Sequence, residues 1–535
     1  MSALNGFGVR NLRSFGSGEK LIPVKKINVL VGKNSCGKST FLRSFPLLRQ
    51  SVESDTRSPI LWYGGYVDFG DFSTALQDGA KEIFFDFDLE LSPGDAFTWE
   101  PWQKRQYSGG FSENDVYKSL VTIGLRKSES DLLCTTIGFQ ILSAKVDLVY
   151  SGAEVLSVSV TCLKTGHVEL YQPTVIASKG AIIPKNVCSY REVVVKSASG
   201  STFKRTASID VLNSDSLTRM AKYLLGFHHS SKQYKNVRSL LYSLPLSSGD
   251  KLIENLREIF YKDKFFIKRL DEHSSEIADM CFQYLLSSKI SYFWTSADRF
   301  LEGFYSGVRY LGPLRASAER FYRHQDLQIG EVDHTGSNLP MVINSLDSKK
   351  KRELSNWVFE NFGFKLELEA SGLHYALKIK EEHDDRFHNV SDMGFGYSQI
   401  LPVIVSMWLE LVDAKKVGFP GLSGRSGKLK NDRSRTLVIE QPELHLHPAL
   451  QYRFGLAIAK VASLAESDNL IIVIETHSKH LIDALGASVR DKVISESLIN
   501  IALFEKESGR PTSVTFSGFD EEGYLVNWPA GFLSA

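Results

Sequence analysis

The sequence predicts an α/β fold with a parallel β-sheet core, an antiparallel β-subdomain and an inserted arm of strands and helices. Three short apolar runs, at residues 27–31, 436–439 and 470–474, are typical of strands buried on both faces. The first run leads into a glycine-rich loop and then into a helical pattern. β-Forming residues dominate from about 81 to 172, and helical patterns dominate from about 210 to 301.

The composition is that of a folded protein with ordinary charge balance. The 535 residues are 43% hydrophobic and 23% charged, which excludes global disorder, and this length predicts two or three packed units. Sixty-three Lys and Arg against 62 Asp and Glu leave a net charge of +1, so bulk charge does not indicate a nucleic-acid partner.

The five cysteines are too few for a disulfide framework and form no CxxC pair. They are Cys36, Cys134, Cys162, Cys188 and Cys281.

No segment predicts export or membrane insertion. Residues 1–20 carry charges and glycines and have no apolar core, unlike a signal peptide. The longest uncharged run, residues 393–409, is broken by glycine, proline and polar residues, unlike a membrane span. We therefore expect a cytoplasmic protein without a membrane partner.

The loop after the first apolar run fits the Walker A pattern GxxxxGK[ST] at every defined position. Gly32 and Gly37 let the backbone turn its N–H groups toward phosphate oxygens. Lys38 supplies a positive charge to the β- and γ-phosphates, Ser39 supplies a hydroxyl to Mg²⁺, and the following helix N-terminus favours an anion. The sequence therefore predicts a site for ATP and Mg²⁺. The residues expected to contact the nucleotide are Gly32, Asn34, Ser35, Cys36, Gly37, Lys38, Ser39 and Thr40.

Polar residues follow the other two apolar runs. Glu440 ends the run 436–439, and a carboxylate at the end of a buried parallel strand is well placed to hold Mg²⁺ through its waters, with Ser39 as the other metal residue. Gln441 or Glu443 could orient the attacking water, and glutamine cannot accept its proton. His477, after the run 470–474, is suited to sensing the γ-phosphate.

A histidine pair, His445 and His447, lies in the stretch ELHLH. On a helix these two side chains would diverge, and no partner residues for a metal triad are evident. We therefore expect no metal site at this pair.

Four motifs together resemble the ABC-type ATPase heads of the SMC and OLD families. They are GKNSCGKST (32–40), SDMGFGYSQILP (391–402), TLVIEQPELHLHP (436–448) and VIETHS (473–478), in the order of the family. The resemblance implies an ABC-type ATPase head that hydrolyses ATP. It also identifies residues 391–399 as the signature segment, which in such families caps the γ-phosphate of ATP held by the other subunit.

The signature segment departs from the usual LSGGQ form, so either Ser391 or Ser398 could make the cap. Gly394 and Gly396 complete the group that the resemblance assigns to the nucleotide. Because the cap would act on another copy of the chain, we expect a homodimer or a higher oligomer with two equivalent composite sites.

A narrower resemblance comes from YLGPLRASAERFY (310–322) and DEEGYLVNWPAGF (520–532). These stretches are similar to a bacterial group of AAA-family ATPases, the PtuA family of Septu antiphage systems, also found attached to some retrons. The resemblance implies a regulatory ATPase that works with a separate HNH nuclease of the PtuB type, and in retrons with a reverse transcriptase and its RNA and DNA. It also places Arg13 near the adenine, although an ordinary surface arginine fits nearly as well.

The Walker A loop and Glu440 lie much farther apart in the sequence than in a compact ATP-binding domain. We therefore predict a head whose N-terminal half, with Walker A, is residues 1–95. Its C-terminal half is residues 301–535. This half contains the signature segment, the acidic strand end at Glu440 (the Walker B motif) and His477 (the switch histidine). Residues 96–300 are the inserted β-then-helical region.

Three biological functions are compatible with these motifs, and a regulatory ATPase of an antiphage system that holds a nuclease is the favoured one. The second is an SMC-like DNA repair or maintenance ATPase that clamps DNA directly, for which the basic stretch 415–435 is the one hint. The third, an OLD-type nuclease, is disfavoured because no Asp-x-Asp pair follows Ser478.

Overall fold

The computed structural model describes residues 2–18, 20–56, 58–95, 111, 115–127, 133–171, 175–177, 180–196, 202–230, 232–323, 329–417, 435–465 and 470–529. These residues form two compact units. Unit 1 comprises Met1–Asn11, Asp55–Ile60 and Asp78–Glu302; unit 2 comprises Leu12–Ser54, Leu61–Gln77 and Gly303–Ala535. Most of the basic stretch 415–435 and the last three residues of the stretch 520–532 lie outside the described residues. The division at residues 95 and 300 remains a prediction.

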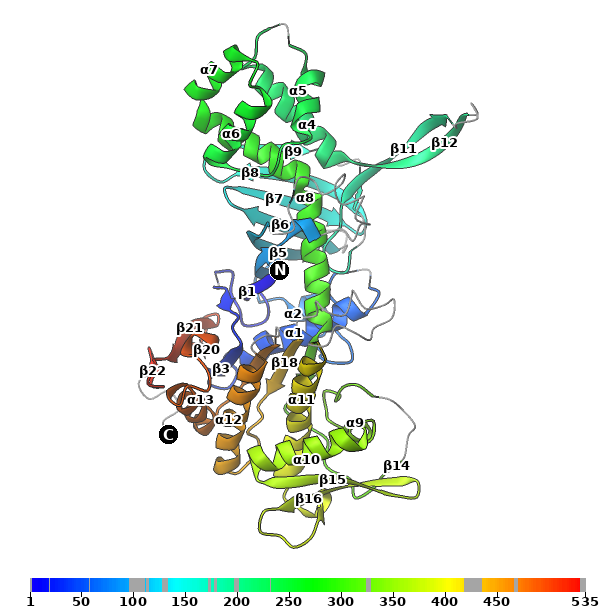
Figure 1. Ribbon diagram of the computed structural model, residues 1–535, viewed down its shortest axis with the longest axis vertical. Helices are drawn as coiled ribbons and strands as arrows, with labels where there is room; N and C mark the ends of the chain where they lie inside the picture. Colours follow the sequence, from blue (N-terminus) through cyan, green and yellow to red (C-terminus); the bar gives the residue numbers. More distant parts are fainter. Residues whose placement is uncertain are drawn as a thin grey trace. The chain divides into compact units, whose positions relative to one another are not determined.

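A mainly parallel β-sheet forms the centre of unit 2 (Figure 1). In spatial order its strands are β13 (Val308–Leu311), β18 (Arg435–Glu440), β19 (Leu470–Glu475), β3 (Ile27–Gly32), β20 (Ile499–Glu505), β21 (Ser513–Phe519) and β22 (Leu525–Val526). The pairs from β13 to β20 are parallel, and β21 and β22 add antiparallel strands at one edge. All six residues of β3 are buried, as expected for a strand covered on both faces. The three predicted strands are thus neighbours in one sheet.

Helices pack against this sheet and close its core. Helix α1 (Lys38–Glu53) contacts β3, β13, β18 and β19, and α11 (Phe395–Val417) and α12 (Pro448–Leu464) contact β18 and β19 respectively. Helix α12 also packs against α13 (Lys479–Arg490). The core joins alternate residues of β3 to the buried faces of α11 and α12, so one face of the strand lies under these helices. Its members include Ile27, Val29, Val31, Ile400, Leu401, Ile404, Phe454 and Ile458.

The remaining elements of unit 2 are short strands and helices. A small sheet has the order β14-β16-β15, with β17 beside β16. The bounds are β2 (Ile22–Pro23), α2 (Phe72–Ala75), β14 (Tyr322–Arg323), α9 (Leu339–Asn344), α10 (Ser348–Phe362), β15 (Phe364–Ser371), β16 (His374–Glu381), β17 (His388–Asn389), η2 (Val390–Asp392) and η3 (Glu496–Leu498).

Helix α11 holds the one window among the described residues that is long and apolar enough to cross a membrane, Phe395–Val412. Within the protein, 67% of this window is buried, and its apolar side chains belong to the core of unit 2. Its apolar character is therefore explained by packing against β18 and α12.

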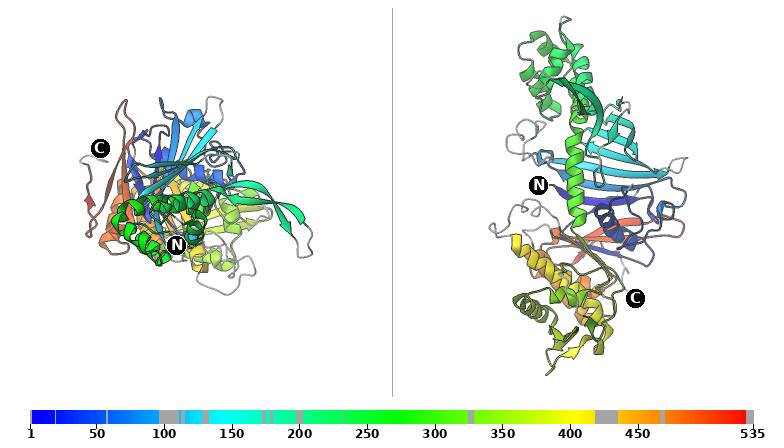
Figure 2. Two further views of the ribbon diagram at one scale, coloured as in Figure 1. Left: turned by 90° about the horizontal axis from the view of Figure 1, so that it is seen from above. Right: turned by 90° about the vertical axis from the view of Figure 1, so that its right-hand side faces the viewer.

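Unit 1 contains the predicted antiparallel sheet (Figure 2). Its strands within this unit have the order β12-β11-β10-β8-β7-β6-β5-β4-β1, with β9 beside β8. Its strands are β1 (Ala3–Arg10), β4 (Glu82–Leu91), β5 (Tyr117–Lys127), β6 (Leu133–Ile141), β7 (Ala144–Ser151), β8 (Glu154–Cys162), β9 (Val168–Tyr171), β10 (Ile176–Ala177), β11 (Val187–Lys196) and β12 (Thr202–Asp210). Strand β7 alternates buried and partly exposed residues along its whole length, as expected for a sheet with one packed face. The hairpin β11–β12 extends away from the other strands of this unit (Figure 1).

Helices follow the sheet in unit 1, as the sequence predicts. They are α4 (Val211–Leu225), α5 (Tyr234–Leu241), α6 (Gly249–Ile259), α7 (Lys264–Glu272) and α8 (Ser274–Ser306), with the short η1 (Pro93–Asp95) earlier in the chain. Side chains of α8 such as Phe293 and Trp294 are fully buried and pack in edge contacts on Tyr117 and Phe139 of the sheet. The predicted α/β class is confirmed, with a mainly parallel sheet in unit 2 and an antiparallel sheet followed by helices in unit 1.

Two helical glycines provide a test of the packing. A Cβ atom at Gly455 of α12 would lie 2.6 Å from Ala484 Cβ and 2.8 Å from the Leu481 carbonyl oxygen, whereas one at Gly303 of α8 would meet nothing within 4 Å. We expect Gly455→Ala to destabilise the fold by about 1–3 kcal/mol through overpacking. Gly303→Ala should stabilise it by about 0.5–1 kcal/mol through helix propensity. Urea unfolding midpoints measure both, and a Gly455→Ala variant as stable as the wild type would contradict this packing.

Candidate nucleotide-binding site

The Walker A loop joins β3 to α1, and the Lys38 side chain folds back onto the main chain of the loop. Gly37 has a φ of 100°, and a Cβ atom there would lie 2.8 Å from Thr512 Oγ1 and 2.9 Å from Ser14 Oγ, so this position requires glycine. The Lys38 ammonium group, which is 3% exposed, donates to the Lys33 carbonyl oxygen at 2.8 Å. Cys36 is also buried, which raises the pKa of its thiol, whereas Asn34 is exposed. The strand–loop–helix arrangement predicted for this segment is present.

A cavity of about 390 Å³ lies over this loop. Its lining residues are Arg13, Ser14, Ser35, Gly37, Lys38, Ser39, Thr40 and Lys506. Arg13 thus lies beside the phosphate loop, and its guanidinium carbon stacks 4.3 Å from the Phe69 ring centroid. Burial, and then the charge of Arg43, lowers the pKa of Arg13. Its contact with adenine remains a prediction.

Glu440 lies at the carboxyl end of β18, and both oxygens of its carboxylate accept hydrogen bonds. Arg43, one turn into α1, donates to Oε2 at 2.9 Å and to Oε1 at 2.8 Å, and the Tyr310 hydroxyl donates to Oε2 at 2.8 Å. The Glu440 side chain is 3% exposed, and that of Arg43 is 34% exposed. Such a two-pronged Arg–carboxylate pair fixes both position and charge, and it ties the end of β18 to the start of α1.

A second carboxylate, Glu475, lies at the end of β19, the strand directly beside β3. The Ser39 hydroxyl donates to its Oε1 at 3.0 Å, and Lys38 Nζ lies 3.8 Å from the same oxygen. Its Oε2 is buried and has no hydrogen-bond partner among the described residues. Burial, and then the negative charge of Glu440, raises the pKa of Glu475 to about 7. The structure therefore brings Glu475 to the two Walker A residues that the sequence assigns to phosphate and metal.

The three candidates for orienting water and sensing phosphate also lie at this edge of the sheet. Gln441 has a left-handed backbone (φ 44°), and its N–H donates to the Glu475 carbonyl oxygen at 2.9 Å. Glu443 Oε1 accepts from the His477 N–H at 2.6 Å. Burial raises the pKa of Glu443. Burial, and to a smaller extent the positive charge of Lys38, lowers the pKa of His477. The choice between Gln441 and Glu443 stays open.

The signature segment forms a short turn followed by the start of α11. Ser391 is exposed and its hydroxyl donates to Asn389 Oδ1 at 2.9 Å, whereas Ser398 is buried and donates to the Phe395 carbonyl oxygen at 2.7 Å. Gly394 is exposed at the tip, and Gly396 lies inside α11, where a Cβ atom would come within 2.6 Å of the His445 carbonyl oxygen. Of the two serines, Ser391 is the one accessible to another molecule.

A buried arginine joins the signature helix to the end of β18. Gln399 and Arg315 exchange two hydrogen bonds: the Arg315 N–H donates to Gln399 Oε1 at 3.1 Å, and Gln399 Nε2 donates to the Arg315 carbonyl oxygen at 3.0 Å. The Arg315 guanidinium also donates to the Glu440 carbonyl oxygen at 3.0 Å. Burial lowers the pKa of Arg315 to about 10. The main chains of α11 and β18 are thus fixed to one another.

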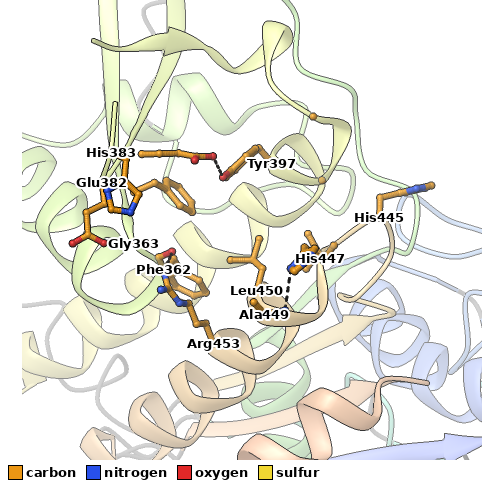
Figure 3. A pocket seen from close by; sticks show the side chains of 15 residues that line it. Phe362, Gly363, Glu382, His383, Tyr397, His445, His447, Ala449, Leu450 and Arg453 are labelled. Atoms are coloured by element: carbon orange, nitrogen blue, oxygen red, sulfur yellow. Dashed lines mark hydrogen bonds between the residues drawn. The ribbon is translucent and has the colours of Figure 1, made fainter. Parts of the chain in front are cut away.

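A second pocket, of about 420 Å³, lies beside the signature segment (Figure 3). Gly394, just before α11, and Gly396 and Tyr397 of α11 line one side, and His445 and His447 line it from the ELHLH stretch. The two histidines point in different directions in Figure 3, and His447 Nδ1 accepts from the Ala449 N–H at 3.3 Å, which caps α12. This pocket and the cavity over the phosphate loop have no lining residue in common.

Sequence reasoning missed several residues of the site. They are Arg43, Tyr310, Arg315, Gln399, Glu475 and Lys506. Glu475 carried a usable signal, because it ends a buried apolar run in the same way as Glu440. The others act through contacts with distant segments, which no local pattern reveals.

A glycine loop at the end of a central parallel strand, with buried carboxylates at two neighbouring strand ends, defines an ATPase of the phosphate-loop class. The family described as AAA ATPase domain (AAA_15) matches residues 203–482, which is more than half of the sequence, and the chain belongs to this family. No curated protein sequence matches the chain.

Several solved structures are similar to this chain over most of its length. They include an Smc head bound to the C-winged helix domain of ScpA (10% identity, covering 97% of this chain and 98% of that chain, TM-score 0.32). An Smc head with a coiled coil and joint derived from Pyrococcus yayanosii has 10% identity, 98% coverage of both chains and a TM-score of 0.35. The recombination mediator protein RecF-ATPrS of the RecFOR pathway has 10% identity, with coverage of 96% of this chain and 98% of that chain and a TM-score of 0.25. The fold assignment rests on the strand order of this chain itself.

The Arg43–Glu440 pair provides a test of the site geometry. Arg43→Met leaves a buried carboxylate without its cation, and we expect the free energy of unfolding to fall by about 3 kcal/mol. This is the lower end of the range for a broken buried ion pair, because a third of the Arg43 side chain is exposed. Glu440→Gln added to Arg43→Met should recover part of this loss, because the uncompensated charge is then gone. Urea unfolding of the four proteins of this double-mutant cycle gives the coupling energy. Strictly additive effects would contradict the pairing.

Proposed function

We propose that this chain is an ATP-binding and ATP-hydrolysing regulatory subunit of a cytoplasmic antiphage defence complex. In this proposal it dimerises around ATP, and its nucleotide state controls a partner nuclease. The observation that carries the ATPase part is the cluster of Lys38 and Ser39 with buried carboxylates at the ends of β18 and β19. The regulatory part rests on the resemblance of residues 310–322 and 520–532 to the PtuA family.

The proposed chemistry follows from the placement of each group. Lys38 and the N–H groups of the loop bind the phosphates, and Ser39 contributes its hydroxyl to Mg²⁺, which when bound neutralises charge on the β- and γ-phosphates. Glu440 would hold the hydrated ion through water. Glu443 has a buried Oε2 without a hydrogen-bond partner among the described residues, which supports it over Gln441 as the group that accepts a proton from the attacking water. His477 senses the γ-phosphate.

Two observations support dimerisation around ATP. Ser391 and Gly394 are exposed, so the signature segment is accessible to a second copy. The signature segment of the same chain contributes no lining residue to the cavity over the phosphate loop, as expected when the signature of one copy completes the site of another. ATP would then join two copies, and its hydrolysis would release them.

Control of a nuclease requires a surface that a partner can reach. In the stretch that resembles the PtuA family, Tyr524 is 72% exposed beside β22, and exposed tyrosines are common anchors of protein interfaces. Arg315, in the other such stretch, serves the nucleotide site itself. The alternative, an SMC-like ATPase that clamps DNA directly, rests on the basic stretch 415–435, most of which lies outside the described residues.

Two variants should distinguish ATP binding from ATP-dependent dimerisation. Lys38→Ala is expected to weaken ATP binding by roughly 100-fold or more, because it removes charge-assisted contacts to the phosphates. Ser391→Arg should bind ATP normally and remain a monomer, since a large side chain blocks the capping surface. Calorimetry measures binding, and sedimentation with a non-hydrolysable ATP analogue and Mg²⁺ measures assembly.

The control for the signature variant is Ser371→Arg, which also changes an exposed serine and should dimerise with nucleotide. Undiminished ATP binding by Lys38→Ala would reject the site. A nucleotide-dependent dimer of Ser391→Arg would reject the capping role.

The nuclease partnership is tested by co-expression with the neighbouring genes. We expect an HNH nuclease encoded beside this chain to co-purify with it, and Tyr524→Ala to reduce its retention several-fold. Tyr63→Ala, which changes another tyrosine that is 68% exposed, is the control and should retain the nuclease. The absence of a co-purifying HNH nuclease would reject the regulatory role while leaving the ATPase assignment intact.

A further inference from the structure

We propose that Glu475 is the carboxylate that binds the divalent cation of the nucleotide site directly, together with the Ser39 hydroxyl. The inference rests on the proposed ATP-binding function and adds a metal residue to it. Glu440, which lies one strand farther from the phosphate loop, then acts on the hydrated ion through water.

The strand order places Glu475 closer to the phosphate loop than Glu440. Glu475 pairs with Leu30 of β3 on one side and with Glu440 of β18 on the other. The Ser39 hydroxyl, which the Walker A pattern assigns to the cation, donates to Glu475 Oε1 at 3.0 Å. The two proposed ligands are therefore already in contact.

Glu475 also has a carboxylate oxygen that could bind a cation. Its side chain is 1% exposed, and Oε2 has no hydrogen-bond partner among the described residues. The nearby cation is Lys38, whose Nζ lies 3.8 Å from Oε1. When Lys38 turns to the phosphates of bound ATP, the buried Glu475 carboxylate would lose the cation that lies 3.8 Å from it, and a buried charge that loses its counter-charge costs several kcal/mol. A divalent cation at this position supplies the missing charge.

Glu440 is in a different situation, because both oxygens of its carboxylate already accept hydrogen bonds, three in all. Two nitrogens of Arg43 and the Tyr310 hydroxyl occupy its two oxygens. Direct binding of a metal ion by Glu440 would have to break this buried ion pair. A cation at Glu475 Oε2 displaces no hydrogen bond of that oxygen among the described residues, and Glu475 gives up only its 3.8 Å contact with Lys38.

The ligand set fits Mg²⁺ that arrives with a nucleotide. This ion is usually bound through one or two carboxylates together with phosphate oxygens and water. In the described part of the chain, no group of three or more His, Cys, Asp or Glu side chains could hold a metal ion unaided. We therefore expect tight cation binding only in the presence of ATP.

The experiment measures cation binding rather than catalysis. Mn²⁺ is titrated into the full chain in the presence of a non-hydrolysable ATP analogue, and free Mn²⁺ is followed by electron paramagnetic resonance. Glu475→Gln keeps an oxygen that accepts the Ser39 hydrogen bond and removes the charge. We expect this variant to bind Mn²⁺ more weakly by roughly 10–100-fold or more, because the loss of an outer partner alone costs this much.

Binding of the analogue in EDTA provides the second readout. Glu475→Gln should keep wild-type affinity there or exceed it, because a negative charge near the phosphates is gone. Glu475→Asp, which keeps the charge but withdraws the carboxylate, should weaken Mn²⁺ binding with unchanged affinity in EDTA. Glu521→Gln changes an exposed carboxylate and is the control.

Wild-type Mn²⁺ affinity in both Glu475 variants would overturn the inference. Loss of nucleotide binding in EDTA by both variants would overturn it too, because that result marks a role in holding the loop rather than the ion. A wild-type protein that binds no nucleotide under either condition would instead reject the proposed function.

Discussion

The nucleotide site depends on the neutralisation of two buried carboxylates by cations from the start of a single helix. Lys38 lies beside Glu475, and Arg43 donates two hydrogen bonds to the Glu440 carboxylate. A buried carboxylate without a cation costs several kcal/mol, so these pairs hold the ends of β18 and β19 against the first turns of α1. Segments from opposite ends of the sequence are thereby fixed around the place where phosphate and metal are expected.

A second set of contacts connects this centre to the signature helix. Arg315 exchanges two hydrogen bonds with Gln399 of α11 and donates to the Glu440 carbonyl oxygen. Because these groups are buried, neither end can move alone without leaving polar atoms unpaired. We therefore expect the end of β18 and the first turn of α11 to move together.

Local patterns predicted much of the fold and part of the site. Continuous apolar runs identified β3, β18 and β19, and the glycine spacing identified the phosphate loop. The sequence predicts a metal role for Glu440 at its strand end and none for Glu475, although Glu475 also ends an apolar run. Its importance comes from strand order: β19 lies between β3 and β18, and no feature of the sequence reveals which strands are neighbours. The sequence does not reveal Arg43 and Tyr310 as the partners of Glu440 for the same reason.

The most direct test of this account is a structure of the protein with a non-hydrolysable ATP analogue and Mn²⁺, in which anomalous scattering locates the ion. The account predicts phosphates on the loop of residues 32–40 and an anomalous peak within coordination distance of Ser39 Oγ, beside the carboxylate of Glu475. A nucleotide bound elsewhere, or an ion remote from both strand ends, would contradict it.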